Sequence, residues 1–422
     1  MYDVQDSQAV ARGHRALFRS SLRTGVGRTV ILLGVVSLLT DISSEMVATV
    51  LPLYLIYNVG LSPLQFGVVD GIYQGGAAVV RVASGFFADR TRRHKEVALA
   101  GYGLSALCRP LLIVFGSVWG ALAAVVFLDR TGKGIRTGPR DALISLSTKP
   151  ERLGTAFGIH RALDTTGAML GPLLAFGLLL LVPQGFNSVF VVSFVFAILG
   201  VAMLALFVRN PPRQASATAQ QPKVTVAAAA RLVGRGSFAR LVIAASLVAL
   251  FTISDGFVYL ALQQRVDFDT GFFPLLYVAT ALVYMLLAVP VGALGDRVGR
   301  VRVFLGGCVA LLAVYGVLLT DLDGLGMVGL ALALFGLYYA ATDGVLAAIA
   351  SALLPADLRA TGLSVVIAVS GVTRLVASIV FGALWTATDV HTAVVFYAVG
   401  LAAVLPVVAI LVLRRRPEGA RA

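Results

Sequence analysis

Apolar stretches long enough to span a membrane, separated by short polar breaks, follow one another along most of this 422-residue chain. Residues 189–208, for example, read VFVVSFVFAILGVAMLALFV and contain no charged side chain. A helix needs about 20 such residues to cross the hydrocarbon core of a bilayer, and a helix in a soluble core seldom needs that many. We therefore predict twelve transmembrane helices at residues 29–58, 63–88, 97–116, 119–146, 152–182, 187–208, 237–263, 271–295, 301–320, 325–352, 358–386 and 391–413.

Composition and charge agree with a membrane protein. Only 13% of the residues are charged and 58% are hydrophobic, whereas a soluble domain has about 25% charged residues. The net charge of +13 could suggest nucleic-acid binding, but Lys and Arg fall mainly in alternate loops, as the positive-inside rule describes. We therefore expect a multi-pass protein of the cell (inner) membrane with both termini in the cytoplasm, in contact with the lipid bilayer and without a nucleic-acid partner.

No residue pattern in the sequence indicates an enzyme. There is no nucleotide-binding loop, no zinc-ligand cluster and no arrangement of a nucleophile with a base. Cys108 and Cys308 both lie in apolar spans, which is not typical of a disulfide framework or a metal site. We expect no catalytic residues, no metal and no cofactor, and an ion gradient rather than ATP as the energy source.

The predicted helices form two halves with related sequences. SGFFADRTRR at Ser84–Arg93 has a counterpart in VGALGDRVGR at Val291–Arg300, and ERLGTAFG at Glu151–Gly158 has one in DLRATGLS at Asp357–Ser364. Each counterpart lies about half a chain further on, which is typical of transporters built from two parallel repeats. The predicted organisation is a cytoplasmic N-terminal segment (1–28), a six-helix bundle (29–208), a cytoplasmic linker (209–236), a second six-helix bundle (237–413) and a cytoplasmic tail (414–422).

The two loop segments carry a resemblance to a known family. GFFADRTRR at 85–93 resembles the Gly-x-x-x-Asp-Arg-x-Gly-Arg-Arg/Lys loop motif of the major facilitator superfamily, and GALGDRVGR at 292–300 matches it more fully, because the first copy has Arg92 where glycine is usual. The resemblance implies an all-α integral membrane protein with the fold of that superfamily, twelve transmembrane helices in two pseudo-symmetric six-helix bundles. Its gating residues would be Gly85, Asp89, Arg90, Arg93, Gly292, Asp296, Arg297 and Arg300. The alternative is a plain turn with charges that stop translocation.

The fourth predicted helix carries a second motif. Arg130-x-x-Lys133-Gly134 resembles the Arg-x-x-Gln-Gly motif of the superfamily, with lysine in place of glutamine. In the family that arginine is associated with proton coupling. Arg136 and Arg140, which follow, fit inner-loop charges that set the topology.

A third motif lies in the fifth predicted helix. Gly167-x-x-x-Gly171-Pro172 resembles the Gly-x-x-x-Gly-Pro antiporter motif of drug/proton exchangers, although Leu173 and Leu174 replace the usual Gly-Gly. A general packing face of small residues is the alternative.

Several charged residues fall inside predicted spans, where each costs about 2.5–3.5 kcal/mol on insertion scales. These residues are Asp41, Glu45, Arg109, Arg130, Arg161, Asp164, Asp255, Asp343 and Arg374. The resemblance implies that the first, fourth, seventh and tenth helices line a central cavity. A carboxylate that exchanges an arginine for water during the transport cycle would bind and release a proton. The alternative is a set of static ion pairs, such as Asp164 with Arg161, with His160 as a packing residue.

Together these features favour a secondary active transporter that moves a small solute by alternating access. The favoured type is a monomeric, proton-coupled exporter of the drug or metabolite antiporter kind. A proton symporter or facilitator that imports a nutrient, metal chelate or siderophore is an alternative. A membrane sensor that transports nothing is a second one.

Overall fold

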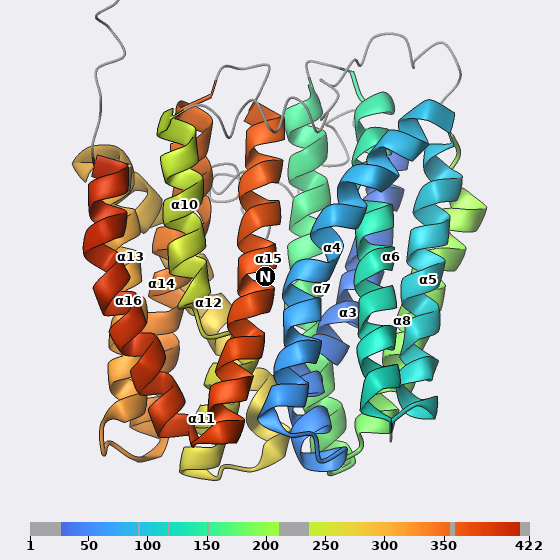
Figure 1. Ribbon diagram of the computed structural model, residues 1–422. Helices are drawn as coiled ribbons and strands as arrows, with labels where there is room; N and C mark the ends of the chain where they lie inside the picture. Colours follow the sequence, from blue (N-terminus) through green and yellow to red (C-terminus); the bar gives the residue numbers. More distant parts are fainter. Residues whose placement is uncertain are drawn as a thin grey trace, which may run out of the picture. The chain divides into compact units, whose positions relative to one another are not determined.

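The computed structural model describes residues 27–91, 93–116, 118–149, 152–210, 236–354 and 359–413, with the backbone alone for residues 78–79, 81–91 and 360–361. Every regular element in these ranges is helical (Figure 1). The first half contains α3 (Arg28–Leu53), the π-helix η1 (Tyr54–Asn58), α4 (Pro63–Thr91), α5 (His94–Val114), α6 (Trp119–Leu146), α7 (Leu153–Leu181) and α8 (Phe186–Phe207). The second half contains α10 (Gly236–Leu250), α11 (Asp255–Val266), the 3-10 helix η4 (Thr270–Phe272), α12 (Phe273–Val298), α13 (Arg300–Leu319), α14 (Gly324–Ala352), α15 (Arg359–Ala387) and α16 (Val390–Leu413).

The predicted spans agree with these helices to within a few residues, and residues 119–146 coincide with α6. Ten helical stretches of the described chain are long and apolar enough to cross a membrane. α6 is not among them, because it carries several charged residues within its length. Its charges therefore need partners inside the protein.

The chain packs into two compact units. In the described ranges, one unit consists of residues 27–210 with 267–279, and the other of residues 236–266 with 280–413. Each has its own buried core. The core of the first includes Val30, Leu33, Val36, Tyr102, Leu143, Ile144 and Leu204. The core of the second includes Phe238, Leu241, Val303, Phe304, Val345 and Val366.

Within the first unit, α3 and α7 approach each other at two glycines of α7. A Cβ atom built on Gly167 would lie 2.4 Å from the carbonyl oxygen of Leu38, and one built on Gly171 would lie 2.8 Å from that of Ile42. Side-chain carbon atoms are not found so close to a backbone oxygen, so only glycine permits this approach. Pro172 is buried directly after the second glycine, and α7 continues past it to Leu181. The motif at Gly167 and Gly171 thus lies in a packing contact between two helices.

The seventh predicted span, residues 237–263, corresponds to a stretch at Gly236–Val266 that is long and apolar enough to cross a membrane, but its helix is interrupted. α10 and α11 are separated by residues 251–254. The hydroxyl of Tyr315 on α13 bridges the gap, because it accepts a hydrogen bond from the Ile253 amide at 2.8 Å and donates one to the Phe251 carbonyl at 2.8 Å. Inside a membrane no water satisfies freed backbone groups, so a broken helix requires such a partner.

Replacing Tyr315 by phenylalanine is expected to destabilise the second unit, because two buried backbone groups lose their partner. We expect a loss of about 2–4 kcal/mol, seen as a lower unfolding temperature of the purified protein in nanodiscs. Tyr102→Phe is the matched control, since the Tyr102 hydroxyl is buried without a hydrogen-bond partner among the described residues. Equal unfolding temperatures for the two variants would contradict the bridging role of Tyr315.

Gly167→Ala is expected to lower stability by about 1–3 kcal/mol, because the added methyl group collides with the backbone of α3. Gly177→Ala on the same helix is the control: its Cβ would meet no atom within 4 Å, and alanine favours a helix over glycine. Thermal unfolding of both variants tests the contact. A Gly167→Ala protein as stable as Gly177→Ala would show that α3 and α7 do not pack this closely.

Candidate functional site

Four charged side chains of α6 lie on one face of this helix. Asp129, Lys133, Arg136 and Arg140 are spaced by four, three and four residues, which places them on the same side of the helix. Arg136 is only 4% exposed. The interpretation of Arg136 and Arg140 as loop charges is therefore wrong, because both lie within α6 and contact carboxylates of other helices.

Asp129 holds two guanidinium groups. Arg109 of α5 lies 2.9 Å from one carboxylate oxygen, and Arg130 donates to the other oxygen from its Nε at 3.0 Å and from a second nitrogen. Arg109 also donates to the hydroxyls of Ser43 and Ser44 on α3, at 3.2 Å and 3.1 Å. One buried carboxylate thus connects α6 with α5 and, through Arg109, with α3.

Arg130 is fixed on its other side by an aromatic ring. Its Cζ lies 3.9 Å from the centroid of the Tyr73 ring on α4, within the range of a cation–π interaction. A small pocket is lined by Arg130, Tyr73 and Ser44, among other residues of α3 to α6. Arg130 therefore lies at the wall of a pocket and is held there by Asp129 and Tyr73.

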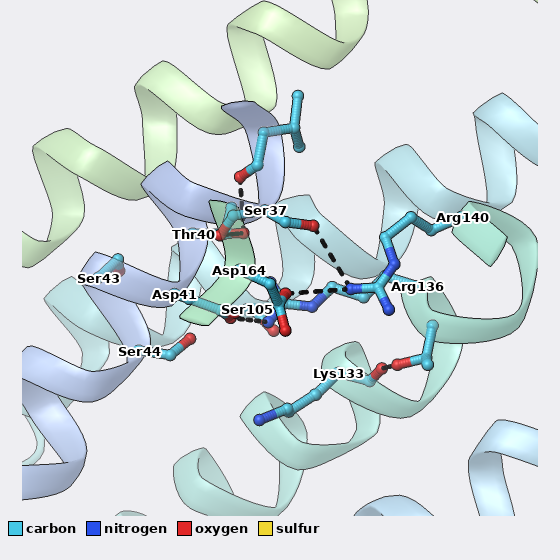
Figure 2. A network of polar contacts seen from close by, with 12 residues as sticks. Ser37, Thr40, Asp41, Ser43, Ser44, Ser105, Lys133, Arg136, Arg140 and Asp164 are labelled. Atoms are coloured by element: carbon cyan, nitrogen blue, oxygen red, sulfur yellow. Dashed lines mark hydrogen bonds and ion pairs between the residues drawn. The ribbon is translucent and has the colours of Figure 1, made fainter. Parts of the chain in front are cut away.

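Asp41 of α3 and Asp164 of α7 face each other closely enough for their carboxyl groups to interact (Figure 2). Each also has an arginine from α6, with N–O distances of 3.7 Å from Arg136 to Asp41 and from Arg140 to Asp164. Arg161, one turn before Asp164, lies 3.4 Å from it. Two carboxylates and three arginines from α3, α6 and α7 thus form one cluster, in which Asp164 pairs with Arg140 as well as with the predicted Arg161.

Polar contacts around Arg140 connect the same three helices. Arg140 lies 3.0 Å from the carboxylate of Asp141 and donates to the Ser37 hydroxyl at 3.4 Å. The Ser37 hydroxyl in turn contacts Nε2 of the buried His160 ring at 2.8 Å. His160 therefore links α7 to α3 beside the carboxyl pair.

Glu45 and Lys133 differ from the rest of the cluster. Among the described residues, neither side chain makes a hydrogen bond or an ion pair. In Figure 2 the ammonium end of Lys133 is free of the dashed contacts. Both residues are partly buried, so two opposite charges lie at the cluster without an ion pair or a side-chain hydrogen bond to any described residue.

A smaller polar group lies in the second unit. Tyr339 of α14 donates a hydrogen bond to Asp255, the first residue of α11. Arg374 of α15 interacts electrostatically with Asp255, Asp343 and the neighbouring tyrosines of α14. The structure therefore brings together the three charged residues that the sequence singled out in this half.

The second copy of the loop motif, residues 292–300, lies at the junction of α12 and α13. Asp296 and Arg300 form an exposed ion pair at 2.9 Å, and Arg300 also donates to the Ala348 carbonyl near the end of α14 at 3.5 Å. Between them Gly299 has a φ of 103°, a left-handed conformation that favours glycine. Gly292 is half-buried in α12 and Arg297 is exposed.

In the first copy, Arg93 is exposed directly before α5. Gly85, Asp89 and Arg90 fall where only the backbone of α4 is described, and Arg92 lies outside the described residues. The side-chain contacts described for the loop motif are therefore those of the second copy.

Sequence reasoning did not assign a site role to Asp129, Lys133, Arg136 or Arg140. The signal was present in their spacing, which repeats every three to four residues as on one helix face. Ser43 and Ser44, which bind Arg109, had no comparable signal, because a serine inside a span is common without any function.

Comparisons with known proteins agree with this architecture. The model of the Major Facilitator Superfamily matches residues 33–279 and 260–422. The uncharacterized MFS-type transporter MJ1317 of Methanocaldococcus jannaschii is 33% identical over 374 residues, which cover 85% of this chain and 89% of that protein.

Two solved structures illustrate the fold. The nucleoside transporter NupG is similar with a TM-score of 0.75 and 15% identity, over 92% of this chain and 100% of that one. The D-xylose-proton symporter is similar with a TM-score of 0.69 and 14% identity, over 90% of this chain and 96% of that one. Identities this low show the fold alone, whereas the family model and the archaeal relative span most of the sequence. The chain therefore belongs to the Major Facilitator Superfamily and is a multi-pass membrane transporter.

Proposed function

We propose that this protein is a secondary active transporter that exports a small solute by alternating access and couples the export to proton uptake. The observation that carries the proposal is the carboxyl pair of Asp41 and Asp164. Two ionised carboxylates in contact repel each other strongly in buried surroundings. Here Arg136 and Arg140 offset the repulsion, each at 3.7 Å from one carboxylate.

The proton enters when an arginine leaves. If α6 moves relative to α3 and α7 during the cycle, the pair loses positive charge and is stable only after one carboxyl group takes up a proton. The return of the arginine expels that proton. Because both arginines lie on α6, at Arg136 and Arg140, one movement of this helix changes both ion pairs at once.

Of the other groups near the pair, Lys133 moves with the two arginines because it also lies on α6, whereas His160 and Arg161 stay with Asp164 on α7. Lys133 acts on Asp41 through space, and His160 and Arg161 lie beside Asp164 on α7. The positive charges of Lys133, Arg136, Arg140 and Arg161 oppose the binding of a proton by the pair while α6 is in the position seen here. Proton uptake is therefore favoured in an arrangement of the helices that moves these charges away.

Export is favoured over import by the resemblance of Gly167-x-x-x-Gly171-Pro172 to the motif of drug/proton exchangers. Import by symport is the second candidate, because the same proton site serves either direction and a similar fold is found in a D-xylose-proton symporter. The basic residues in alternate loops support an orientation in the inner membrane with both termini in the cytoplasm.

The coupling is tested with purified protein in liposomes that contain a pH-sensitive dye, using a compound screen to find a transported solute. We expect Asp41→Asn and Asp164→Asn to reduce solute-driven proton movement by at least about tenfold, since an amide cannot take up the proton. Exchange of labelled for unlabelled solute needs no net proton turnover and should persist in both variants.

Glu96→Gln is the control for this experiment. Glu96 is an exposed carboxylate of α5 that accepts a hydrogen bond from Asn210 at 2.9 Å. It is not part of the cluster around Asp41 and Asp164. Unchanged proton movement in the Asp41→Asn, Asp164→Asn double variant would refute the proposed coupling. The sign of the proton flux relative to the solute flux separates antiport from symport.

A further inference from the structure

We propose that Glu45 and Lys133 form the two ends of a binding site for a zwitterionic solute, with Lys133 binding its carboxylate and Glu45 its ammonium group. The inference rests on the proposed transport function and names the class of solute carried. It starts from the contrast between these two residues and the other charged side chains of the cluster, each of which has an ionic or hydrogen-bonding partner.

The two residues come from facing helices of one unit. Glu45 is one helical turn after Asp41 on α3, and Lys133 is one turn after Asp129 on α6. Lys133 interacts through space with both Glu45 and Asp41, yet the described residues show no ion pair between Lys133 and either carboxylate. Two opposite charges are therefore near each other but separated.

An unpaired charge at membrane depth is costly, about 2.5–3.5 kcal/mol on insertion scales. Two such groups that lie close without pairing are stabilised when a ligand that carries both a negative and a positive charge binds between them. A molecule with a carboxylate at one end and an ammonium group at the other satisfies both charges at once. A purely anionic or purely cationic solute satisfies one and leaves the other unpaired.

The surroundings favour the same orientation of the ligand. Glu45 also interacts electrostatically with Arg130 and with Tyr73, which stack on each other. Arg130 is bound to Asp129 and to the ring and makes no ion pair with Glu45 among the described residues. Gly171 of α7 lies against the Cβ of Glu45.

The binding experiment uses two matched sets of probes on the wild-type protein in nanodiscs, without any proton gradient. One set is phenylalanine, 3-phenylpropionate and 2-phenylethylamine. The other is 6-aminohexanoate, hexanoate and hexylamine, which covers a longer distance between the charges. We expect a zwitterion of at least one set to bind about tenfold or more tightly than its acid and its amine, measured by calorimetry.

Single neutral variants assign the two ends. Glu45→Gln should weaken zwitterion and amine binding about tenfold and leave acid binding unchanged, whereas Lys133→Gln should weaken zwitterion and acid binding and leave amine binding unchanged. Glu96→Gln and Lys149→Gln, at exposed positions outside the cluster, are the controls. Unfolding temperatures of all variants confirm that a loss of binding is not a loss of folding.

Two results would overturn the inference. In one, neither zwitterion binds better than its acid and amine. In the other, the Glu45 and Lys133 variants bind like the wild type and both lose stability, which would mean that the two side chains pair with each other.

Failure of the zwitterion site can be told apart from failure of the proposed function. Zwitterion binding without proton movement in liposomes would refute the proposed coupling alone. Proton-coupled flux of a neutral or singly charged solute would refute the zwitterion site alone.

Discussion

A charge buried in an apolar helix bundle is stable only next to an opposite charge, and the first unit is organised by this requirement. α6 carries a row of charged residues through a bundle that is otherwise hydrophobic. Three helices supply an oppositely charged counterpart, with Arg109 on α5, Asp41 on α3 and Asp164 on α7, and α4 supplies the ring of Tyr73. The ion pairs therefore determine which faces of these helices meet, while apolar packing stabilises their contact.

The close contact of α3 and α7 and the carboxyl pair depend on each other. Gly167 is three residues after Asp164, and Leu38, which it touches, is three residues before Asp41. On each helix the two positions are one turn apart. The approach that the glycine permits is therefore the approach that brings the carboxyl groups together. A bulkier residue at this position would separate the acids and weaken their repulsion, so a packing residue determines the electrostatics of the site.

The sequence was sufficient to predict the helices but not their partners. Hydrophobic length identifies most spans almost by itself, and for this reason residues 187–208 were predicted close to the observed bounds of α8. The residue that pairs with Arg109 could not be predicted, because Asp129 lies on another helix and only tertiary packing brings the two together. A chain of helices contains many possible pairs of opposite charges, and spacing along one helix does not choose among them.

The break between α10 and α11 was missed for a similar reason. Residues 251–254 read FTIS and contain neither proline nor glycine, so no local signal interrupts the helix. The interruption depends on Tyr315, which is distant in sequence and supplies the two hydrogen bonds that the open backbone needs. A backbone conformation that is stabilised by a distant side chain is not encoded in the segment that adopts it.

Both units contain charged groups that interact with one another, but the second unit also uses a neutral contact. In the first unit ionic groups satisfy one another, so a change of protonation changes the forces between whole helices. In the second unit, beside the charged group of Asp255, Asp343 and Arg374, the Tyr315 hydroxyl satisfies the backbone groups freed by the helix break. A neutral hydrogen bond breaks and forms again at less cost than an ion pair in the same surroundings. Asp255 lies at the first residue of α11, where the positive end of the helix dipole favours a carboxylate. The break therefore creates a helix terminus that stabilises this charge inside the unit, as a continuous helix would not.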